Sequence, residues 1–96
     1  MLYVIARIPV QEGRYEEVRA AMLELAASSR REDGCLRYDV LGDRGTGVFV
    51  TREEWRDAAA EQAHMQGAAV AAVFAAVGGA LAAPPEILRL RAESLS

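Results

Sequence analysis

The sequence predicts an α+β fold in which a four-stranded antiparallel sheet carries helices on one face. Runs of β-branched and other apolar residues alternate with stretches of helical periodicity, in the order β-α-β-β-α-(α)-β. This order is the ferredoxin-like arrangement. The chain has 96 residues, which suits one domain, so we expect a single domain spanning residues 1–96.

The first predicted strand covers residues 2–10, which are rich in residue types that suit a pleated, half-buried surface. One face carries Leu2, Val4, Ala6 and Ile8, and the other carries Tyr3, Ile5 and Arg7. Both faces are therefore mostly apolar. A strand of this kind needs a covering layer on each side.

The first predicted helix follows a turn at residues 11–13. Its apolar stripe recurs at helical spacing and consists of Tyr15, Val18, Met22, Leu25 and Ser29. Acidic side chains near its start and Arg30-Arg31 at its end match the helix dipole. We expect Asp33-Gly34 to break the helix.

Two strands are predicted next, over residues 35–41 and 48–54. In the first of them Leu36, Tyr38 and Val40 alternate with Cys35, Arg37 and Asp39. The glycine-rich stretch 42–47 lies between the two strands. Glycine-rich phosphate-binding loops run from a strand into a helix, whereas this one joins two strands, so a hairpin is favoured.

Two helices and a last strand complete the fold. Asp57 is a suitable cap for a helix that ends near Gly67. A third helix carries Val70, Val73, Phe74 and Val77 and is expected to stop at residues 78–79. Prolines at 84 and 85 precede a fourth strand over residues 86–91, and prolines suit a sheet edge.

The uncharged segment 67–85 approaches the ~20 residues of a membrane-spanning helix. It is mostly alanine, contains a glycine pair and ends in two prolines. These features favour a buried or interface helix, and we expect no membrane association.

Because the predicted helices cover only one side of the sheet, a second copy of the chain is the natural cover for the other side. The sequence therefore predicts a two-fold homodimer.

Composition excludes several classes of function. The net charge is -3, with fourteen acids against eleven bases, which argues against a nucleic-acid partner. The single cysteine, Cys35, excludes an internal disulfide and favours a reduced, cytoplasmic location. Arg7 and Pro9 interrupt the apolar start, so no signal peptide is expected. One histidine and one cysteine cannot build a closed zinc site, so no metal site is predicted.

Three groups of residues resemble a known family. Gly34-Cys35-Leu36-Arg37-Tyr38 opens the second strand, Glu53-Glu54-Trp55 closes the third, and His64 follows Trp55 nine residues later. This pattern resembles the antibiotic biosynthesis monooxygenase (ABM) domain family, whose members form dimeric α/β barrels. The resemblance implies a cofactor-independent oxygenase of phenols or quinols. The family also includes haem-degrading oxygenases and an isomerase of a phosphorylated sugar derivative.

The chain departs from the family pattern in two respects. Oxygenases of this family use an asparagine together with the tryptophan, and this chain has no asparagine. Thr51 and Arg7 stand near where one would be sought. Many members carry a second histidine shortly after the first, which serves as the iron ligand in the haem-degrading branch. Ala68 and Ala69 occupy that region here, so no haem or other cofactor is expected.

His64 is the candidate catalytic residue. Histidine is the side chain whose reference pKa, about 6.5, lies near neutrality, so it is suited to accept a proton from a phenol or quinol. The alternative is a histidine that packs between helix and sheet and bonds a backbone carbonyl.

Three residues are candidates for substrate binding, each with a structural alternative: Trp55 (stacking or a core anchor), Tyr38 (a hydrogen bond to a substrate oxygen or packing) and Arg37 (an anionic substrate or pairing with Asp39 and Glu53).

Three functions remain open at this point. The first is a homodimeric, cofactor-independent monooxygenase acting on a small phenolic or quinol substrate. The second is a non-catalytic dimeric barrel that binds a small hydrophobic ligand or a partner. The third is an isomerase of a phosphorylated sugar derivative, which needs an arginine such as Arg37 in the cavity. A cavity on which His64 and Tyr38 converge favours the enzyme, and a His64 that points away favours the binding protein.

Overall fold

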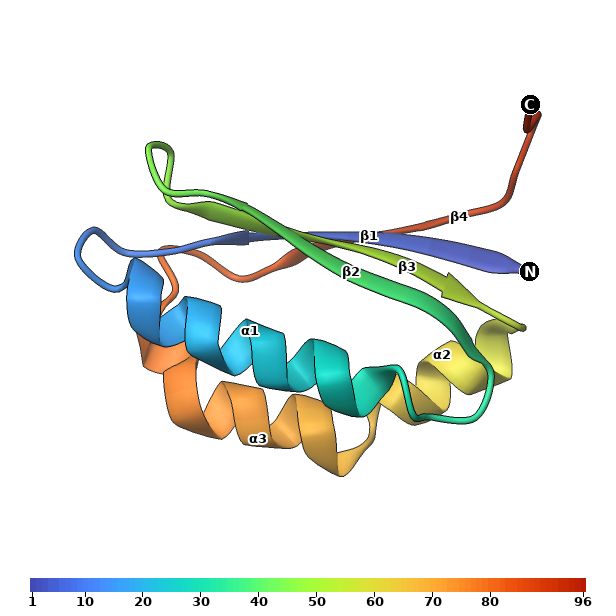
Figure 1. Cartoon of the computed structure of the whole chain (residues 1–96), viewed down its shortest axis with the longest axis horizontal. Coiled ribbons are helices and arrows are strands. Elements are labelled where there is room, and N and C mark those ends of the chain that lie inside the picture. The colour runs from blue at the N-terminus through green and yellow to red at the C-terminus, as the bar shows by residue number, and fades with distance from the viewer.

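The computed structural model describes residues 1–96 and places all helices on one face of a four-stranded antiparallel sheet (Figure 1). The elements are β1 (Leu2–Pro9), α1 (Tyr15–Ser29), β2 (Cys35–Asp43), β3 (Val48–Trp55), α2 (Ala58–Met65), α3 (Ala68–Val77), a short 3-10 turn η1 (Gly78–Ala80) and β4 (Glu86–Leu90). The strand order is β2-β3-β1-β4. The predicted α+β, ferredoxin-like fold is confirmed.

The two central strands carry the core side of the sheet. β1 pairs with β3 from Leu2 opposite Trp55 to Pro9 opposite Val48. Because side chains alternate along a strand, the helix side of β1 buries Leu2, Val4, Ala6 and Ile8. The helix side of β3 buries Phe49, Thr51, Glu53 and Trp55. Two polar residues, Thr51 and Glu53, therefore face the core.

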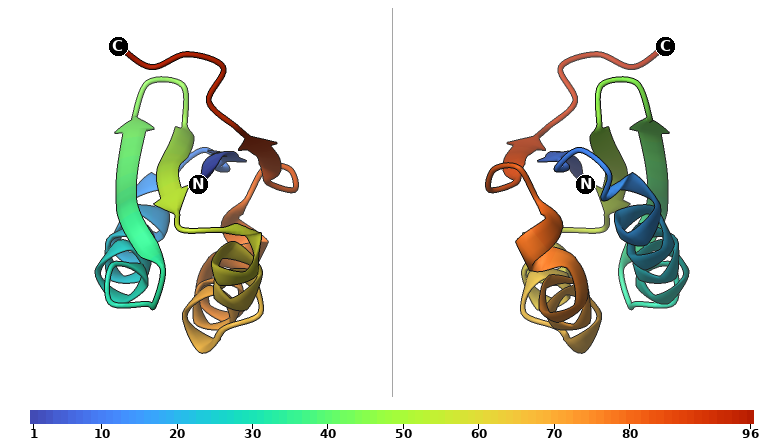
Figure 2. Two further views of the ribbon diagram at one scale, coloured as in Figure 1. Left: turned by 90° about the vertical axis from the view of Figure 1, so that its right-hand side faces the viewer. Right: turned by 90° about the vertical axis from the view of Figure 1, so that its left-hand side faces the viewer.

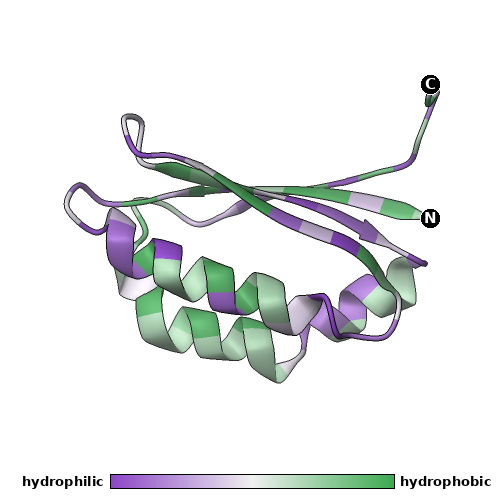
Figure 3. Cartoon of the chain, in the orientation of Figure 1, coloured by the Kyte–Doolittle hydropathy of each residue, from purple (hydrophilic) through white to green (hydrophobic).

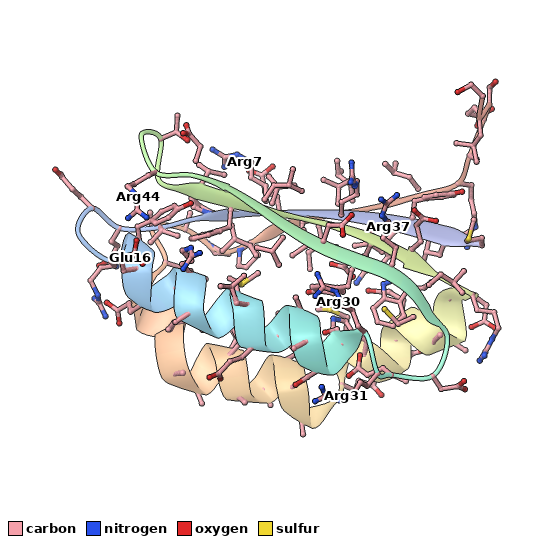
Figure 4. The ribbon with its side chains drawn as sticks, viewed as in Figure 1. Arg7, Glu16, Arg30, Arg31, Arg37 and Arg44 are labelled. Atoms are coloured by element: carbon pink, nitrogen blue, oxygen red, sulfur yellow. The ribbon has the colours of Figure 1, made fainter.

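The hairpin between β2 and β3 confirms the prediction for the glycine-rich stretch, and the strands pair as far as Asp43 opposite Val48. Arg44 of this hairpin pairs with Glu16 on α1 (Figure 4). Its guanidinium also lies 4.7 Å from the centre of the Tyr15 ring. These contacts hold the hairpin against the start of α1.

Helix α1 packs its predicted stripe on the sheet, and Val18, Met22, Leu25 and Ser29 are buried. The expected basic end of this helix is absent, because α1 ends at Ser29 and has no basic residue in its last turn. Arg30 is used differently: its Nε donates to the backbone oxygen of Tyr38 at 2.9 Å. The arginine therefore links the end of the helix to β2.

Helices α2 and α3 are short and meet at a bend. Asp57 caps α2 as predicted, since its Oδ1 accepts a hydrogen bond of 2.9 Å from the Ala60 amide. Helix α3 has no charged residue and is the most apolar helix (Figure 3).

None of the helices has, by itself, the length and hydropathy of a membrane span. Only the pair 58–65 and 68–80 reaches that length and composition, with a bend of 42° between its parts.

Helix α3 ends at Val77, directly before the glycine pair, as the sequence predicted, and the 3-10 turn η1 follows it. Gly78 keeps a right-handed helical backbone, with φ -56° and ψ -36°, and η1 continues to Ala80. Leu81 then forms an isolated bridge with Val10. The chain returns to the sheet as β4, which occupies an edge as expected.

The other face of the sheet carries no helix (Figures 1 and 2). Leu41, Leu88 and Leu90 are among the large apolar residues that are exposed, and alternation along β2 and β4 places all three on this face. Arg7 and Arg37 also project from this side of the sheet (Figure 4).

Candidate functional site

A small cavity lies between the core side of the sheet and the helices, with a volume of about 60 Å³. Its walls are mainly apolar side chains from β1, α3 and β4. Four lining residues carry polar side-chain atoms: Tyr38, Thr51, Glu53 and His64. Two of the side chains predicted from the sequence, Tyr38 and His64, thus converge on one apolar cavity.

Three aromatic rings form a cluster beside this cavity. The ring centre of His64 lies 4.6 Å from that of Trp55 and 5.5 Å from that of Tyr38. Tyr38 and Trp55 meet edge to face at 6.4 Å. All three residues are buried. They come from β2, β3 and α2, so the site exists only when the helix docks on the sheet.

His64 makes one hydrogen bond. Its Nδ1 lies 2.6 Å from Oε1 of Glu32, which belongs to the turn between α1 and β2. A carboxylate only accepts hydrogen bonds, so this contact favours the tautomer that carries its proton on Nδ1. The other ring nitrogen, Nε2, has no hydrogen-bond partner within the chain.

Glu53 is held in the core by its neighbours on β3. Its Oε1 accepts the indole N–H of Trp55 at 2.9 Å, and its Oε2 lies 2.6 Å from the hydroxyl oxygen of Thr51. Burial raises the pKa of the Glu53 carboxyl above its usual range, although both hydrogen bonds and the nearby His64 oppose the shift. The carboxyl thus accepts the hydrogen bond that a buried indole N–H needs.

Tyr38 presents a neutral phenol. Burial raises the pKa of Tyr38 far above its usual range, and the nearby Glu53 carboxyl adds to this effect. The nearby Ser29 hydroxyl opposes this rise in the pKa of Tyr38. The Ser29 hydroxyl oxygen is buried and makes no hydrogen bond. Tyr38 therefore keeps its proton at neutral pH.

Comparison with known proteins assigns the chain to a family. The sequence profile of the antibiotic biosynthesis monooxygenase family matches residues 1–76. The chain belongs to the ABM family. No functionally curated protein matches the sequence.

Solved structures give the same fold. A crystal structure described as an antibiotic biosynthesis monooxygenase has a TM-score of 0.90 at 27% identity, covering 98% of this chain and 100% of the other. The protein PA3566 from Pseudomonas aeruginosa has a TM-score of 0.87 at 31% identity, covering 97% and 94%. Rv0793 from Mycobacterium tuberculosis has a TM-score of 0.89 at 26% identity, covering 99% and 97%.

Arg37 lies outside the cavity of this ABM protein. It projects from the helix-free face of the sheet (Figure 4) and pairs with Asp39 at 2.8 Å and Glu54 at 3.6 Å. Pairing is one of the two alternatives given for Arg37 from the sequence. The predicted partner Asp39 is confirmed, but the predicted partner Glu53 was wrong, because Glu53 faces the core. Arg52 likewise pairs with Asp39 at 2.9 Å.

Sequence reasoning missed the roles of Glu32 and Glu53. Glu53 carried a signal: in the run Phe49, Thr51, Glu53, Trp55, alternate residues share one strand face, and a carboxyl between two large aromatic residues is conspicuous there. Glu32 carried none, because it lies 32 positions before His64 in the chain.

Two other groups in the fold show no sign of chemistry. Cys35 is partly buried, and burial raises the pKa of its thiol, which disfavours the reactive thiolate. No group of three or more His, Cys, Asp or Glu side chains is arranged to hold a metal ion.

Proposed function

We propose that this ABM protein is a cofactor-independent monooxygenase that oxidises a small phenolic or quinol substrate with molecular oxygen. The observation that carries the proposal is the convergence of His64 and Tyr38 on one apolar cavity, with the Trp55 ring tilted by 37° against the His64 ring at 4.6 Å between their centres. Family membership over residues 1–76 supports the same activity.

His64 accepts the substrate proton in this proposal. Nε2 takes the phenol proton, which leaves an electron-rich phenolate. A ring carbon that carries hydrogen then bonds to oxygen as electrons pass from the ring to the oxygen molecule. Loss of the ring hydrogen and cleavage of the O–O bond, with return of the proton from His64, release water and leave a quinone carbonyl.

The remaining groups of the site shape the cavity and orient His64 and the substrate. Trp55 supports the imidazole ring, and the neutral Tyr38 phenol is available to a substrate oxygen. Thr51 and Glu53 supply polar atoms on β3 in a chain without asparagine. We also propose that the working form is a homodimer whose two sheets pack through their helix-free faces.

Oxygen consumption tests the proposal. The purified protein and its His64→Ala variant are compared over a panel of hydroquinones. The variant is expected to lose about 10²–10⁴-fold in rate, the usual range for removal of a general base. Gln62→Ala, an exposed substitution on the same helix, serves as the matched control and should keep the rate. Equal oxygen uptake by the protein and the His64→Ala variant contradicts the mechanism.

A non-catalytic protein that binds a small hydrophobic ligand is the second candidate. The mainly apolar walls and small volume of the cavity favour it. Tight binding of a hydroquinone without oxygen uptake would support this candidate.

The isomerase has no such support, since no arginine lines the cavity and Arg37 lies on the opposite face of the sheet.

A further inference from the structure

His64 separates two spaces. Its ring lines the cavity described above and also an open depression of about 280 Å³ at the surface. Glu32 lines only the depression. The His64 side chain is 1% exposed and that of Glu32 is 27% exposed. Nδ1 therefore meets a partly exposed carboxyl group that lines the depression, and the same histidine also lines the cavity.

The backbone around Glu32 is fixed on both sides. The Glu32 amide donates to the Ser29 oxygen at 3.0 Å, and the Glu32 oxygen accepts from the Cys35 amide at 3.1 Å. The Gly34 oxygen in the same turn accepts from the Arg56 amide at 2.8 Å. The turn is thus tied to α1, to β2 and to the end of β3, which holds the carboxylate at a set position relative to α2.

The other charged groups near the ring already have partners. Glu53 from β3 bonds Thr51 and Trp55. Glu61 from α2 binds Arg89 through two hydrogen bonds of 2.9 and 3.1 Å. In the depression, Asp33 pairs with Arg56 at 3.3 Å. Tyr38, which lines the cavity, is a neutral phenol. Glu32 differs from these acids because His64 is the partner of its carboxylate.

We propose that Glu32 is a positioning residue, which holds the proton of neutral His64 on Nδ1, leaves Nε2 as the base facing the cavity, and stabilises the imidazolium that forms when Nε2 accepts a proton. This inference rests on the proposed role of His64. A carboxylate placed in this way orients an imidazole and balances its charge without taking the proton itself.

Nitrogen-15 NMR of the imidazole tests the tautomer without any substrate. The chain has one histidine, so its ring signals need no assignment. At a pH where the ring is neutral, the unmodified protein should show the Nδ1–H tautomer. Glu32→Ala should shift the population toward Nε2–H. Asp33→Asn removes a neighbouring charge from the same depression without touching the ring, and it should leave the tautomer unchanged.

Kinetics test the consequence. We expect Glu32→Ala to lower kcat by about tenfold or more with KM within about twofold, because the lost interaction acts on the proton transfer and not on substrate binding. Glu32→Gln should fall between, since its amide can accept from Nδ1 or donate to it. Asp33→Asn should keep both constants.

The outcomes separate the two proposals. An unchanged tautomer in Glu32→Ala overturns the inference, as does an unchanged kcat in a variant whose tautomer has shifted. If no hydroquinone is oxidised by the unmodified protein, the proposed function fails. The NMR comparison then still decides whether Glu32 sets the tautomer of His64.

Discussion

At the residue scale, the turn that carries Glu32 depends on a glycine at which any side chain would be strained. Gly34 has φ +83°, and a Cβ atom built there would lie 2.5 Å from Cβ of Ala60 on α2. The turn that carries Glu32 therefore approaches α2 as closely as a bare backbone allows. That approach is what lets Glu32 reach His64.

Substitution of Gly34 should be more damaging than substitution of a glycine with the same backbone conformation in open space. Gly13, with φ +81°, has no neighbour within 4 Å of a built Cβ and is the matched control. Gly13→Ala should cost about 1–2 kcal/mol from the left-handed backbone alone. Gly34→Ala should cost about 1–3 kcal/mol more from overpacking.

Urea unfolding of both variants measures the difference. The Gly34 variant should also weaken the Glu32–His64 contact and shift the tautomer of His64 toward Nε2–H. Equal losses of stability in the two variants would show that the turn does not press on α2.

At the scale of the elements, periodicity predicted the strands and helices but not every face. The alternation from Cys35 to Val40 placed Leu36 on the same side as Tyr38. The structure has a bulge between Cys35 and Arg37, and Leu36 is 58% exposed. A bulge adds one residue to one strand and resets its alternation, which the local sequence does not reveal.

The candidate site, like the strand faces, could be predicted from the sequence only in part. The family resemblance named His64 and Tyr38 as site candidates, but whether the two side chains meet at one cavity stayed open until the structure was known. The Glu32 contact could not be predicted, because it depends on how closely a turn approaches a helix. The outward direction of Arg37 likewise follows from the register of β2 against β3.

The cap of α2 supports the helix that carries His64. Asp57 accepts the Ala60 amide, and this hydrogen bond is the largest cause that holds the pKa of the Asp57 carboxyl below its usual range. Asp57→Ala should lower the midpoint of thermal unfolding by about 4–8 °C. Asp57→Asn is the control, because asparagine caps about as well as aspartate.

The effect of Asp57→Ala should depend on pH. The folded-state pKa is lowered, so the carboxylate stabilises the fold above its unfolded pKa, and this contribution disappears as the pH falls through the folded value. Calorimetry at pH 7 and near pH 3 should therefore show a smaller difference between the protein and Asp57→Ala at the acidic pH. A constant difference would mean that the cap does not act through the charged carboxylate.

At the scale of the whole molecule, the helices cover one face of the sheet and none lies on the other (Figure 2). The helix-free face exposes Leu41, Leu88 and Leu90. Leu88 and Leu90 lie on the edge strand β4, and Leu41 lies on the other edge strand, β2. Large apolar side chains exposed on one face of a sheet favour an interaction site there.

The arginines on this face are paired within the chain, since Arg37 contacts Asp39 and Glu54, Arg52 contacts Asp39, and Arg7 contacts Glu86. Three arginines thus face three acids, so no excess of one charge opposes a second copy.

A substitution on this face should therefore separate a dimer. Leu88 is 56% exposed and lies opposite Ile5 of β1 on the helix-free side. In a homodimer, Leu88→Glu would bury an unpaired carboxylate, which is costly. Leu23→Glu is the matched control, because Leu23 is 47% exposed on the outer side of α1.

Light scattering after size-exclusion chromatography measures the mass of each species. The unmodified protein and Leu23→Glu should have twice the mass of one chain, and Leu88→Glu should have the mass of one. Circular dichroism should show the same helix content in all three, because the substituted face packs against nothing within the chain. A single-chain mass for the unmodified protein would contradict the proposed dimer, and it would leave Leu88 as ordinary exposed surface.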